Sequence, residues 1–414
     1  MFKKVAYNTG AQVAGKFVTA ATTLLVTIII GRSLGEAGYG NFTKIFTFIG
    51  YFYTFADFGL NAIYIKSAKP STEQYLLKLL IGLRIIIATS LIFITIALGY
   101  ILPYNSSTGI GFSPLVKIGI ALAAFTILTQ ALFTSINAIF QRKLRYDLSA
   151  IAAVVGALTV LIGAVVCSRF SSTLLGFSAI YVVGGAVTVL AAAIIIHKYF
   201  KINLNPAISY EEFKNLLQQS WPIGLALILN LVYFRVDILI LSLTRSSADV
   251  GIYGLAYQFF EASLAVPIFF SNALYPLLID LKNQSKAKYH KQISNWLKIL
   301  TVVSLLQTSG LLVISMFIPL LYNGQFQGSV LALQVLSLGV PFFFLSALLW
   351  HCLIIVNRQK HLIVIYGIGA VFNIICNLTL IPTYGYLAAA VVTIASEALI
   401  LLLLTIDYRL SKRN

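Results

Sequence analysis

The stretch Ile151-Ala-Ala-Val-Val-Gly-Ala-Leu-Thr-Val-Leu-Ile-Gly-Ala-Val-Val166 contains no charged residue, and its one polar side chain is that of Thr159. A helix that is apolar on every side is typical of one that faces lipid. Crossing the hydrocarbon layer takes about 20 such residues. We therefore predict a membrane-spanning helix over residues 149–168.

The rest of the chain has the same character. Of its 414 residues, 59% are hydrophobic and 10% are charged, whereas soluble domains carry about 25% charged residues. We expect an all-α polytopic membrane protein with little soluble structure, and Pro267 predicts a kink in its eighth span. Twelve spans are predicted, at roughly 9–31, 40–65, 79–102, 115–138, 149–168, 173–196, 221–244, 250–279, 296–321, 329–355, 361–381 and 385–406.

The basic residues are distributed unevenly between the predicted loops. If the N-terminus is cytoplasmic, 22 of the 29 Lys and Arg residues fall in inner segments, Arg84 among them, and 4 fall in outer segments. This bias follows the positive-inside rule and predicts that both termini are cytoplasmic. It also accounts for the net charge of +17 without a nucleic-acid partner.

The longest inner connection divides the chain into two similar halves. Ser209-Tyr-Glu-Glu212 has the pattern of a capping box, which predicts a short amphipathic helix before Trp221-Pro222. Glu36-Ala-Gly-Tyr39 and Asp249-Val-Gly-Ile-Tyr253 open a span in corresponding positions of the two halves, which favours a parallel duplication. We predict an N-terminal six-helix lobe at 1–200, a cytoplasmic linker at 201–220 and a C-terminal lobe at 221–414.

Three cations, Lys16, Lys44 and Arg235, lie inside predicted spans. A charge there costs about 2.5–3.5 kcal/mol on insertion scales, so such residues indicate a wet cavity, a partner or a substrate. The alternative for Lys16 and Lys44 is that each extends to the nearer interface. Arg235 lies about ten residues, roughly 15 Å, from the outer end of its span; its alternative is a structural ion pair with Glu261.

Polar side chains follow one face of several predicted spans, as expected for helices around a central cleft. Isolated Thr residues of this kind can also simply bond neighbouring helices. The stripes contain Asn8, Gln12, Lys16, Thr19, Thr23 and Thr27 in span 1; Lys44, Thr47, Tyr51, Thr54, Asp57 and Asn61 in span 2; Thr126, Gln130, Thr134, Asn137 and Gln141 in span 4; Asn230, Tyr233, Asp237 and Thr244 in span 7; and Tyr253, Tyr257 and Glu261 in span 8.

An ordered set of motifs resembles the Wzx-type polysaccharide flippases, the O-antigen and capsule repeat-unit exporters of the multidrug/oligosaccharidyl-lipid/polysaccharide superfamily. The resemblance covers essentially the whole chain, although no single motif is decisive. The motifs are Gly31-Arg-Ser-Leu-Gly-Glu-Ala-Gly-Tyr-Gly40, Tyr233-Phe-Arg-Val-Asp-Ile-Leu239, Asp249-Val-Gly-Ile-Tyr-Gly-Leu-Ala-Tyr257, Ala273-Leu-Tyr-Pro276, Asn373-Ile-Ile-Cys-Asn377 and Leu380-Ile-Pro-Thr-Tyr-Gly-Tyr-Leu-Ala-Ala-Ala390 with Glu397.

This resemblance implies two six-helix bundles in a V-shaped, MATE-like transporter that works by alternating access in the bacterial inner membrane. The implied substrate is an undecaprenyl-diphosphate-linked oligosaccharide, whose anionic diphosphate suits Lys and Arg. The implied substrate-binding residues are Lys16, Lys44, Arg235, Gln12, Tyr51, Asn230, Tyr233 and Tyr257, and the implied ion-coupling acids are Asp57, Asp237, Glu261 and Glu397.

Two other classes stay open. MATE-type multidrug exporters share the architecture, but their cavities usually depend on carboxylates. Polysaccharide polymerases and ligases are polytopic enzymes with a large outer catalytic loop, whereas the longest outer loop here, Pro103 to Pro114, holds no His, Asp or Glu. A transporter is therefore favoured over an enzyme.

The sequence points to no resident cofactor. The three cysteines, Cys167, Cys352 and Cys376, have no metal-binding spacing and are interpreted as small apolar packing residues. We expect no metal site, and Na⁺ or H⁺ as the coupling ion. The expected partners are the lipid-linked oligosaccharide, the bilayer and polysaccharide polymerase and chain-length machinery, with a monomeric protein.

Overall fold

The computed structural model describes residues 2–69 and 71–413, with side chains described over 14–69, 71–285 and 287–411. The chain forms two compact units, Met1–Arg235 and Val236–Asn414. Nearly all of the regular structure is helical, as the hydropathy predicts. Along the chain, the boundary between the two units falls inside one helix, 15 residues after the end of the predicted linker at residue 220.

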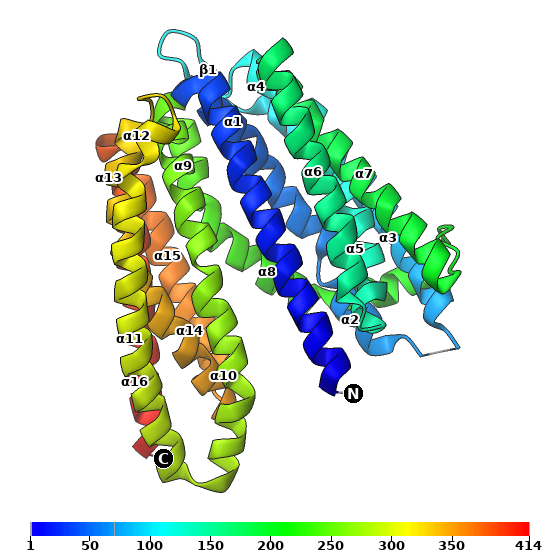
Figure 1. Cartoon of the computed structure of the whole chain (residues 1–414), viewed down its shortest axis with the longest axis vertical. Helices are drawn as coiled ribbons and strands as arrows, with labels where there is room; N and C mark the ends of the chain where they lie inside the picture. Colours follow the sequence, from blue (N-terminus) through cyan, green and yellow to red (C-terminus); the bar gives the residue numbers. More distant parts are fainter. Residues whose placement is uncertain (1, 70, 414) are drawn as a thin grey trace. The chain divides into compact units, whose positions relative to one another are not determined.

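The first helix, α1 (Phe2–Asp57), contains the break that separates the first two predicted spans. Gly35 has φ 67° and ψ −177°, a conformation essentially confined to glycine. Without a break, the 56 residues of α1 would extend for roughly 84 Å at 1.5 Å per residue, far more than one crossing needs. Figure 1 shows that α1 runs as two rods with a turn between them.

Unit 1 is completed by helices that pack around α1, and a short antiparallel hairpin joins two of them. In the hairpin, Tyr104 pairs with Gly111 and Asn105 with Ile110. The elements are α2 (Leu60–Ser67), α3 (Glu73–Ile101), β1 (Tyr104–Asn105), β2 (Ile110–Gly111), α4 (Pro114–Ala123), α5 (Phe125–Arg142), α6 (Tyr146–Phe170), α7 (Leu174–Phe200) and the first part of α8 (Tyr210–Thr244).

The stretch 151–166 lies in α6, as predicted, and α6 is largely exposed. Only 17% of its apolar window is buried, against 50% for α3. The rest of α6 packs on α1 and α7, and on α7 the approach is close: a Cβ added at Gly156 would lie 1.7 Å from Thr188 Oγ1. Small residues permit this close approach of helices in a membrane. The prediction of a lipid-facing helix is therefore confirmed for one face of α6, which carries the exposed side chains of Ile151, Val155, Leu158 and Ile162.

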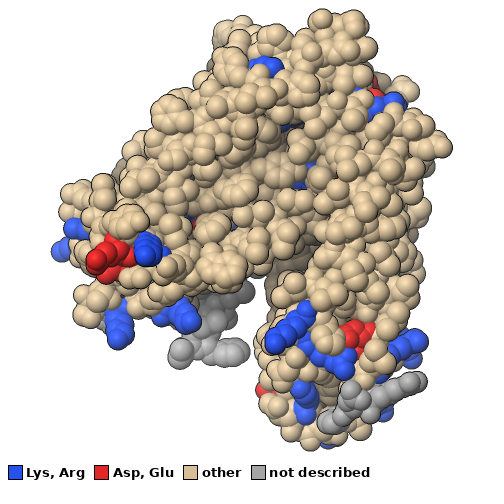
Figure 2. All heavy atoms as spheres, turned by 180° about the vertical axis from the view of Figure 1, so that it is seen from behind, with Lys and Arg blue, Asp and Glu red and all other residues tan. Residues whose placement is uncertain are grey.

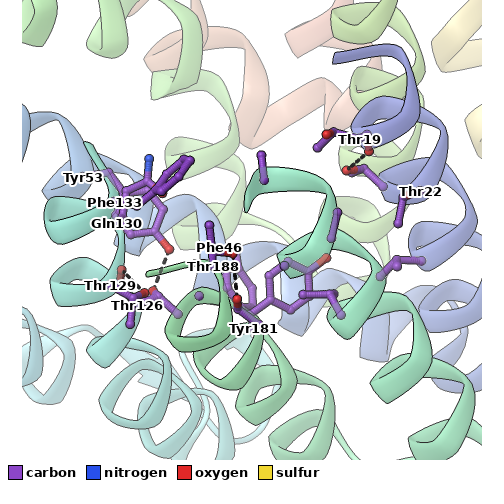
Figure 3. A pocket seen from close by; sticks show the side chains of 18 residues that line it. Thr19, Thr22, Phe46, Tyr53, Thr126, Thr129, Gln130, Phe133, Tyr181 and Thr188 are labelled. Atoms are coloured by element: carbon purple, nitrogen blue, oxygen red, sulfur yellow. Dashed lines mark hydrogen bonds between the residues drawn. The ribbon is translucent and has the colours of Figure 1, made fainter. Parts of the chain in front are cut away.

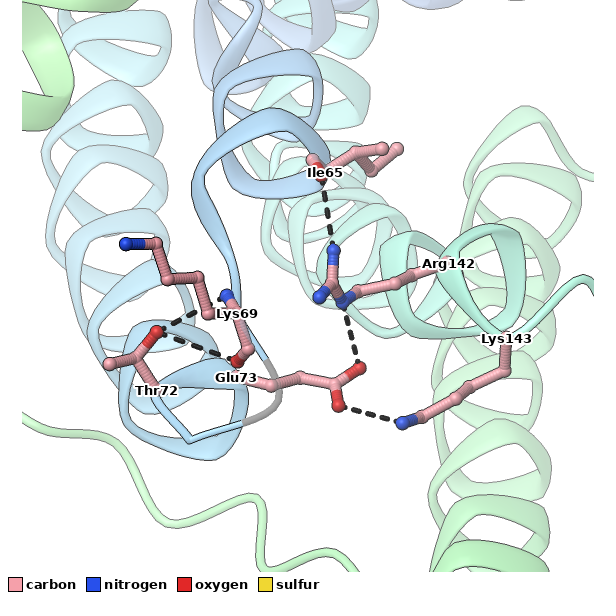
Figure 4. A network of polar contacts seen from close by, with 6 residues as sticks. All are labelled: Ile65, Lys69, Thr72, Glu73, Arg142 and Lys143. Atoms are coloured by element: carbon pink, nitrogen blue, oxygen red, sulfur yellow. Dashed lines mark hydrogen bonds and ion pairs between the residues drawn. The ribbon is translucent and has the colours of Figure 1, made fainter.

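One end of unit 1 is held together by a carboxylate between two cations (Figure 4). Glu73 accepts from Arg142 Nε at 3.1 Å and from Lys143 Nζ at 2.7 Å. Arg142 also donates from Nη1 to the Ile65 carbonyl at 3.2 Å. The two predicted inner connections around residues 66–78 and 142–145 thus lie on the same side of unit 1, as the predicted topology requires.

The predicted linker packs onto unit 1. Residues 201–209 form no helix, and the backbone N–H of Ala207 donates to the Lys78 carbonyl at 2.9 Å. α8 begins directly after Ser209, where the capping-box pattern predicted a helix start. Phe213 and Leu216 are buried in the core of unit 1. The expected short amphipathic helix is therefore the first turns of α8 rather than a separate element.

Unit 2 is also helical. A short helix, α12, follows its longest described helix, α11. The elements are the rest of α8, then α9 (Ser247–Ser263), α10 (Ala265–Gln284), α11 (Lys286–Met316), α12 (Ile318–Leu321), α13 (Gln327–Ser337), α14 (Val340–Ile355), α15 (Gln359–Tyr384) and α16 (Tyr386–Arg413).

The predicted kink at Pro267 is the break between α9 and α10. Proline has no N–H to donate and its ring displaces the carbonyl four residues earlier, here that of Ser263. Gln307 Nε2 on α11 donates to that carbonyl at 3.0 Å. A side chain from a neighbouring helix thus satisfies the group that the proline frees, as buried backbone in a bilayer requires.

The helices are long and apolar enough for the predicted number of crossings. In the described part of the chain, ten helices pass the length and hydropathy requirements, and the bent pair α13–α14 supplies one more span. If the two halves of α1 are counted separately, the total is twelve. On the face drawn in Figure 2, Lys and Arg gather near one end of each unit, and few charged residues lie over the middle of either unit.

Candidate functional site

A cavity of about 380 Å³ lies inside unit 1, between α1, α5, α6 and α7 (Figure 3). We call it the threonine cavity, because hydroxyls from three helices line it. Several of these hydroxyls, such as that of Thr188, donate to a carbonyl of their own helix, so their oxygens can still accept. The threonines are Thr19, Thr22, Thr23, Thr126, Thr129 and Thr188.

Aromatic rings form another wall of the threonine cavity. The rings of Phe46 and Tyr181 lie 4.6 Å apart between centroids, and Phe133 lies on α5. Tyr53 shares a 2.6 Å hydrogen bond with Thr126 Oγ1. None of the described residues that line this cavity is charged. Its surface therefore combines uncharged polar groups with flat apolar ones.

A second cavity of about 350 Å³ lies against the first. The two share Tyr53 and Gln130, and the second also reaches Thr54, Asp57 and Thr134. We call it the Asp57 cavity. Tyr53 and Asp57 are four residues apart, so they lie on one face of α1. Two of the predicted polar stripes, those of spans 2 and 4, thus meet at this cavity.

Asp57 does not stand alone in its cavity. Arg84 Nη2 contacts Asp57 Oδ1 at 2.6 Å, and Arg84 Nη1 donates to Ser135 Oγ at 3.1 Å. The Arg84 side chain is fully buried, whereas 37% of the Asp57 side chain is exposed. Arg84 lies eleven residues into α3, roughly 16 Å from its start. The sequence analysis counted Arg84 as an inner-segment charge, which was wrong: Arg84 is a further cation inside a span, in addition to Lys16, Lys44 and Arg235.

Lys44 is buried rather than presented to a cavity. Only 1% of it is exposed, its Nζ donates to the Gly111 carbonyl at 2.7 Å, and it lies 5.9 Å from the centroid of the Phe112 ring. Lys44 therefore anchors the hairpin between β1 and β2. An anion could reach it only if the hairpin moved. This position does not support the predicted role of Lys44 in substrate binding.

The other predicted substrate residues have unlike surroundings. Lys16 and Asn230 are exposed, and Arg235 is partly buried at the boundary of the two units. Tyr51 is partly buried on α1, while Tyr233 is 7% exposed. The side chain of Gln12 lies outside the described residues. Their predicted shared role at one diphosphate stays a prediction.

A buried polar cluster lies inside unit 2 and contains two of the predicted coupling acids. Asp237 is 3% exposed and accepts from the Tyr253 hydroxyl at 2.5 Å and from Thr393 Oγ1 at 3.5 Å. One turn along α16, Ser396 accepts from Asn373 Nδ2 at 3.0 Å. We call these residues, together with Asn377 and Glu397, the Asp237 cluster.

The Asp237 cluster contains an acceptor that can take a further hydrogen bond. Asn377 Nδ2 donates to Asn373 Oδ1 at 2.9 Å, but the buried Asn377 Oδ1 has no hydrogen-bond partner. Glu397 is 3% exposed and lies one turn beyond Thr393 on α16. Buried carboxylates in a membrane protein are costly and usually functional. This favours Asp237 and Glu397 over the other two predicted acids.

The remaining predicted coupling acids differ from this pair. Asp57 is bound to Arg84, and Glu261 is exposed near the end of α9. The predicted substrate residue Tyr257 packs 5.6 Å from the ring of Tyr253, beside the cluster. No group of three or more His, Cys, Asp or Glu residues suited to a metal occurs among the described residues.

The sequence analysis did not single out Tyr53, Arg84, Tyr181 or Thr188 as functional. Arg84 carried a usable signal, since it falls inside the predicted span 79–102. Tyr181 and Thr188 lie on α7. The mostly apolar sequence of this helix gave no sign that one of its faces lines a cavity. The cavities are made where helices distant in sequence converge, which periodicity along one helix does not reveal.

The fold and these buried polar sites define a multi-pass membrane protein. A profile of the family described as polysaccharide biosynthesis protein matches residues 3–282. The chain belongs to that family. A stretch of 126 residues is 28% identical to an uncharacterized membrane protein of Methanocaldococcus jannaschii, and the match covers 29% of this chain and only 24% of that relative.

Solved structures with the same fold are flippases and exporters. The lipid II flippase MurJ, in an inward closed conformation, matches with a TM-score of 0.78 at 14% identity, over 96% of this chain and 87% of MurJ. An inward-facing multidrug resistance MATE family transporter of the MOP superfamily matches with a TM-score of 0.73 at 12% identity, over 97% of this chain and 99% of the transporter. At these identities the likeness establishes the fold alone.

Proposed function

We propose that this protein is a flippase that moves undecaprenyl-diphosphate-linked oligosaccharide repeat units from the cytoplasmic to the outer leaflet by alternating access. The observation that carries the proposal is its membership of a polysaccharide biosynthesis family on a fold shared with a lipid flippase. The bias of Lys and Arg toward one set of loops supports an orientation with both termini in the cytoplasm.

The coupling ion is proposed to act at the Asp237 cluster. Asp237 and Glu397 are both buried in unit 2, where gain or loss of a cation changes the charge of a water-poor site. A change of that kind can bias two packings of the surrounding helices. H⁺ and Na⁺ are the candidate ions. Asp57 is less suited, because Arg84 already compensates its charge.

A vesicle assay tests the function directly. We expect proteoliposomes to expose undecaprenyl-diphosphate oligosaccharide on the opposite leaflet faster than protein-free vesicles, and an imposed H⁺ or Na⁺ gradient to change the rate. Asp237→Asn removes the charge and is expected to lower the rate at least about tenfold, the equivalent of one charge-assisted contact.

This assay has one control variant, and two outcomes would favour a different function. Asp280→Asn, on α10 outside the Asp237 cluster, serves as the matched control and is expected to leave the rate unchanged. Export of an organic cation without movement of the lipid-linked sugar would favour the multidrug-exporter alternative. Elongation of the glycan by the purified protein would favour a polymerase or ligase.

A further inference from the structure

Gln130 stands at the junction of the threonine cavity and the Asp57 cavity. It lies twelve residues before the end of α5, roughly 18 Å along the helix, and is exposed rather than packed. No hydrogen bond joins its carboxamide to another group in the part of the chain that the structure describes. A free carboxamide in hydrocarbon costs several kcal/mol, so the occupant of this junction is polar and not a lipid tail.

The charges around the two cavities exclude an ionic occupant. Among the described residues that line the two cavities, the threonine cavity has no charged side chain. The Asp57 cavity has one, that of Asp57. Arg84 compensates that carboxylate, and its own fully buried guanidinium does not line either cavity. A diphosphate would find no cation here to replace its water. An organic cation would find no unpaired carboxylate.

The remaining chemistry fits an uncharged molecule with many hydroxyls. Gln130 offers two donors and an acceptor, and the threonine oxygens accept. Thr126 Oγ1 donates to the Ala123 carbonyl, so the Tyr53 hydroxyl donates to Thr126 and can accept from a ligand. Figure 3 shows Tyr53 and Gln130 on one side of the threonine cavity and the Phe46 and Tyr181 rings on another. A sugar ring presents hydroxyls at its edge and C–H groups on its faces. The volumes of about 380 and 350 Å³ fall within the range of small-molecule sites.

We infer that these two cavities form a sugar-binding subsite for one uncharged sugar unit of the transported oligosaccharide. Gln130 and Tyr53 bond its hydroxyls, and Phe46 and Tyr181 lie against its face. The inference rests on the proposed flippase function and deepens it, since it places recognition of the glycan in unit 1. Recognition of the diphosphate then falls to cations elsewhere, such as Lys16 and Arg235.

Binding to purified protein in nanodiscs tests the subsite with two probes. One probe is the lipid-linked oligosaccharide extracted from the source cells, and the other is undecaprenyl diphosphate without sugar. Gln130→Leu keeps the size of the side chain and deletes its hydrogen bonds. We expect it to weaken binding of the first probe about tenfold, the effect of one or two lost hydrogen bonds, and to leave the second unchanged.

Two further variants guard against a folding defect. Gln334→Leu makes the same change on α13, outside both cavities, and is expected to bind both probes normally. Tyr53→Phe deletes only the hydroxyl and is expected to weaken the first probe alone. Equal loss of both probes, or no loss, in Gln130→Leu would overturn the sugar subsite while the flippase function stands. Failure of the unmodified protein to bind either probe would instead overturn the proposed function, and the subsite with it.

Discussion

At the scale of single residues, the pair formed by Arg84 and Asp57 is asymmetric. Arg84 is fully buried, whereas 37% of the Asp57 side chain is exposed. Removing one partner of a buried ion pair costs about 3–5 kcal/mol, because the other charge is left without compensation. Water can reach Asp57 but not Arg84. The cost therefore depends on which partner is removed.

We predict that Asp57→Asn lowers the midpoint of thermal unfolding of the purified protein more than Arg84→Leu does. In the first variant the buried guanidinium loses its charge partner, and in the second the carboxylate can be hydrated. The double variant is expected to cost less than the two single changes together. Arg169→Leu, at an exposed position, is the control. A larger effect for Arg84→Leu would contradict this account.

The same pair indicates how far the sequence could lead. Asp57 was identified as functional because it is an acidic residue in a polar stripe, and the structure does place it at a cavity. Its partner is 27 residues away on another helix, and single-helix periodicity carries no information about such pairing. Lys44 was singled out because its charge lies inside a predicted span. Its contact with Gly111 depends on the fold of a loop, so its role could not be predicted.

At the scale of elements, the turn at Gly35 decides whether α1 makes one long helix or two spans. Its φ of 67° with ψ −177° is costly for any residue with a Cβ, by about 1–3 kcal/mol. Gly50 lies in the same helix, and a Cβ added there meets nothing within 4 Å. An alanine is therefore expected to be strained at position 35 and to fit without strain at position 50.

We predict that Gly35→Ala reduces the amount of folded protein in the membrane, whereas Gly50→Ala leaves it unchanged or slightly higher. Alanine is the better helix former by about 0.5–1 kcal/mol where the space allows it. Membrane abundance and the thermal midpoint of the purified variants measure the difference. Equal behaviour of the two variants would show that the turn does not need glycine.

Element positions were more predictable than element boundaries. The predicted span at 149–168 lies within α6, and that at 173–196 lies within α7 except for its first residue, because continuous apolar runs leave few alternatives. The kink near Pro267 was confirmed, because proline removes a helix hydrogen bond and displaces the carbonyl four residues earlier, and here α9 ends at that residue, Ser263. The predicted boundary between the linker and the seventh span was not confirmed, because α8 continues through Pro222. The apolar face of its first turns packs onto unit 1.

At the scale of the whole molecule, the side on which each loop lies determines the orientation of the protein in the membrane. In unit 2, Lys282 donates to the Ile355 carbonyl at 2.5 Å, and Arg358 contacts Asp407 at 2.6 Å. The connections near residues 285 and 357 therefore lie on one side of unit 2, as the ends joined by Glu73 do in unit 1. Both sides were predicted to be cytoplasmic from charge alone.

Cysteine labelling tests this orientation. Five spans lie between the hairpin at 102–113 and the connection at 285, when α4–α5 and α9–α10 are each taken as one, and an odd number places the two sites on opposite sides of the membrane. With Cys167, Cys352 and Cys376 replaced by Ala, we predict that Ser107→Cys reacts with an impermeant maleimide in intact cells. Asn283→Cys should react only after permeabilisation; both positions are exposed. The reverse pattern would mean an inverted protein, because the charge bias alone assigns the cytoplasmic side. Labelling of both sites from outside would contradict an odd number of spans between them, and with it the counting of α4–α5 and α9–α10 as one span each.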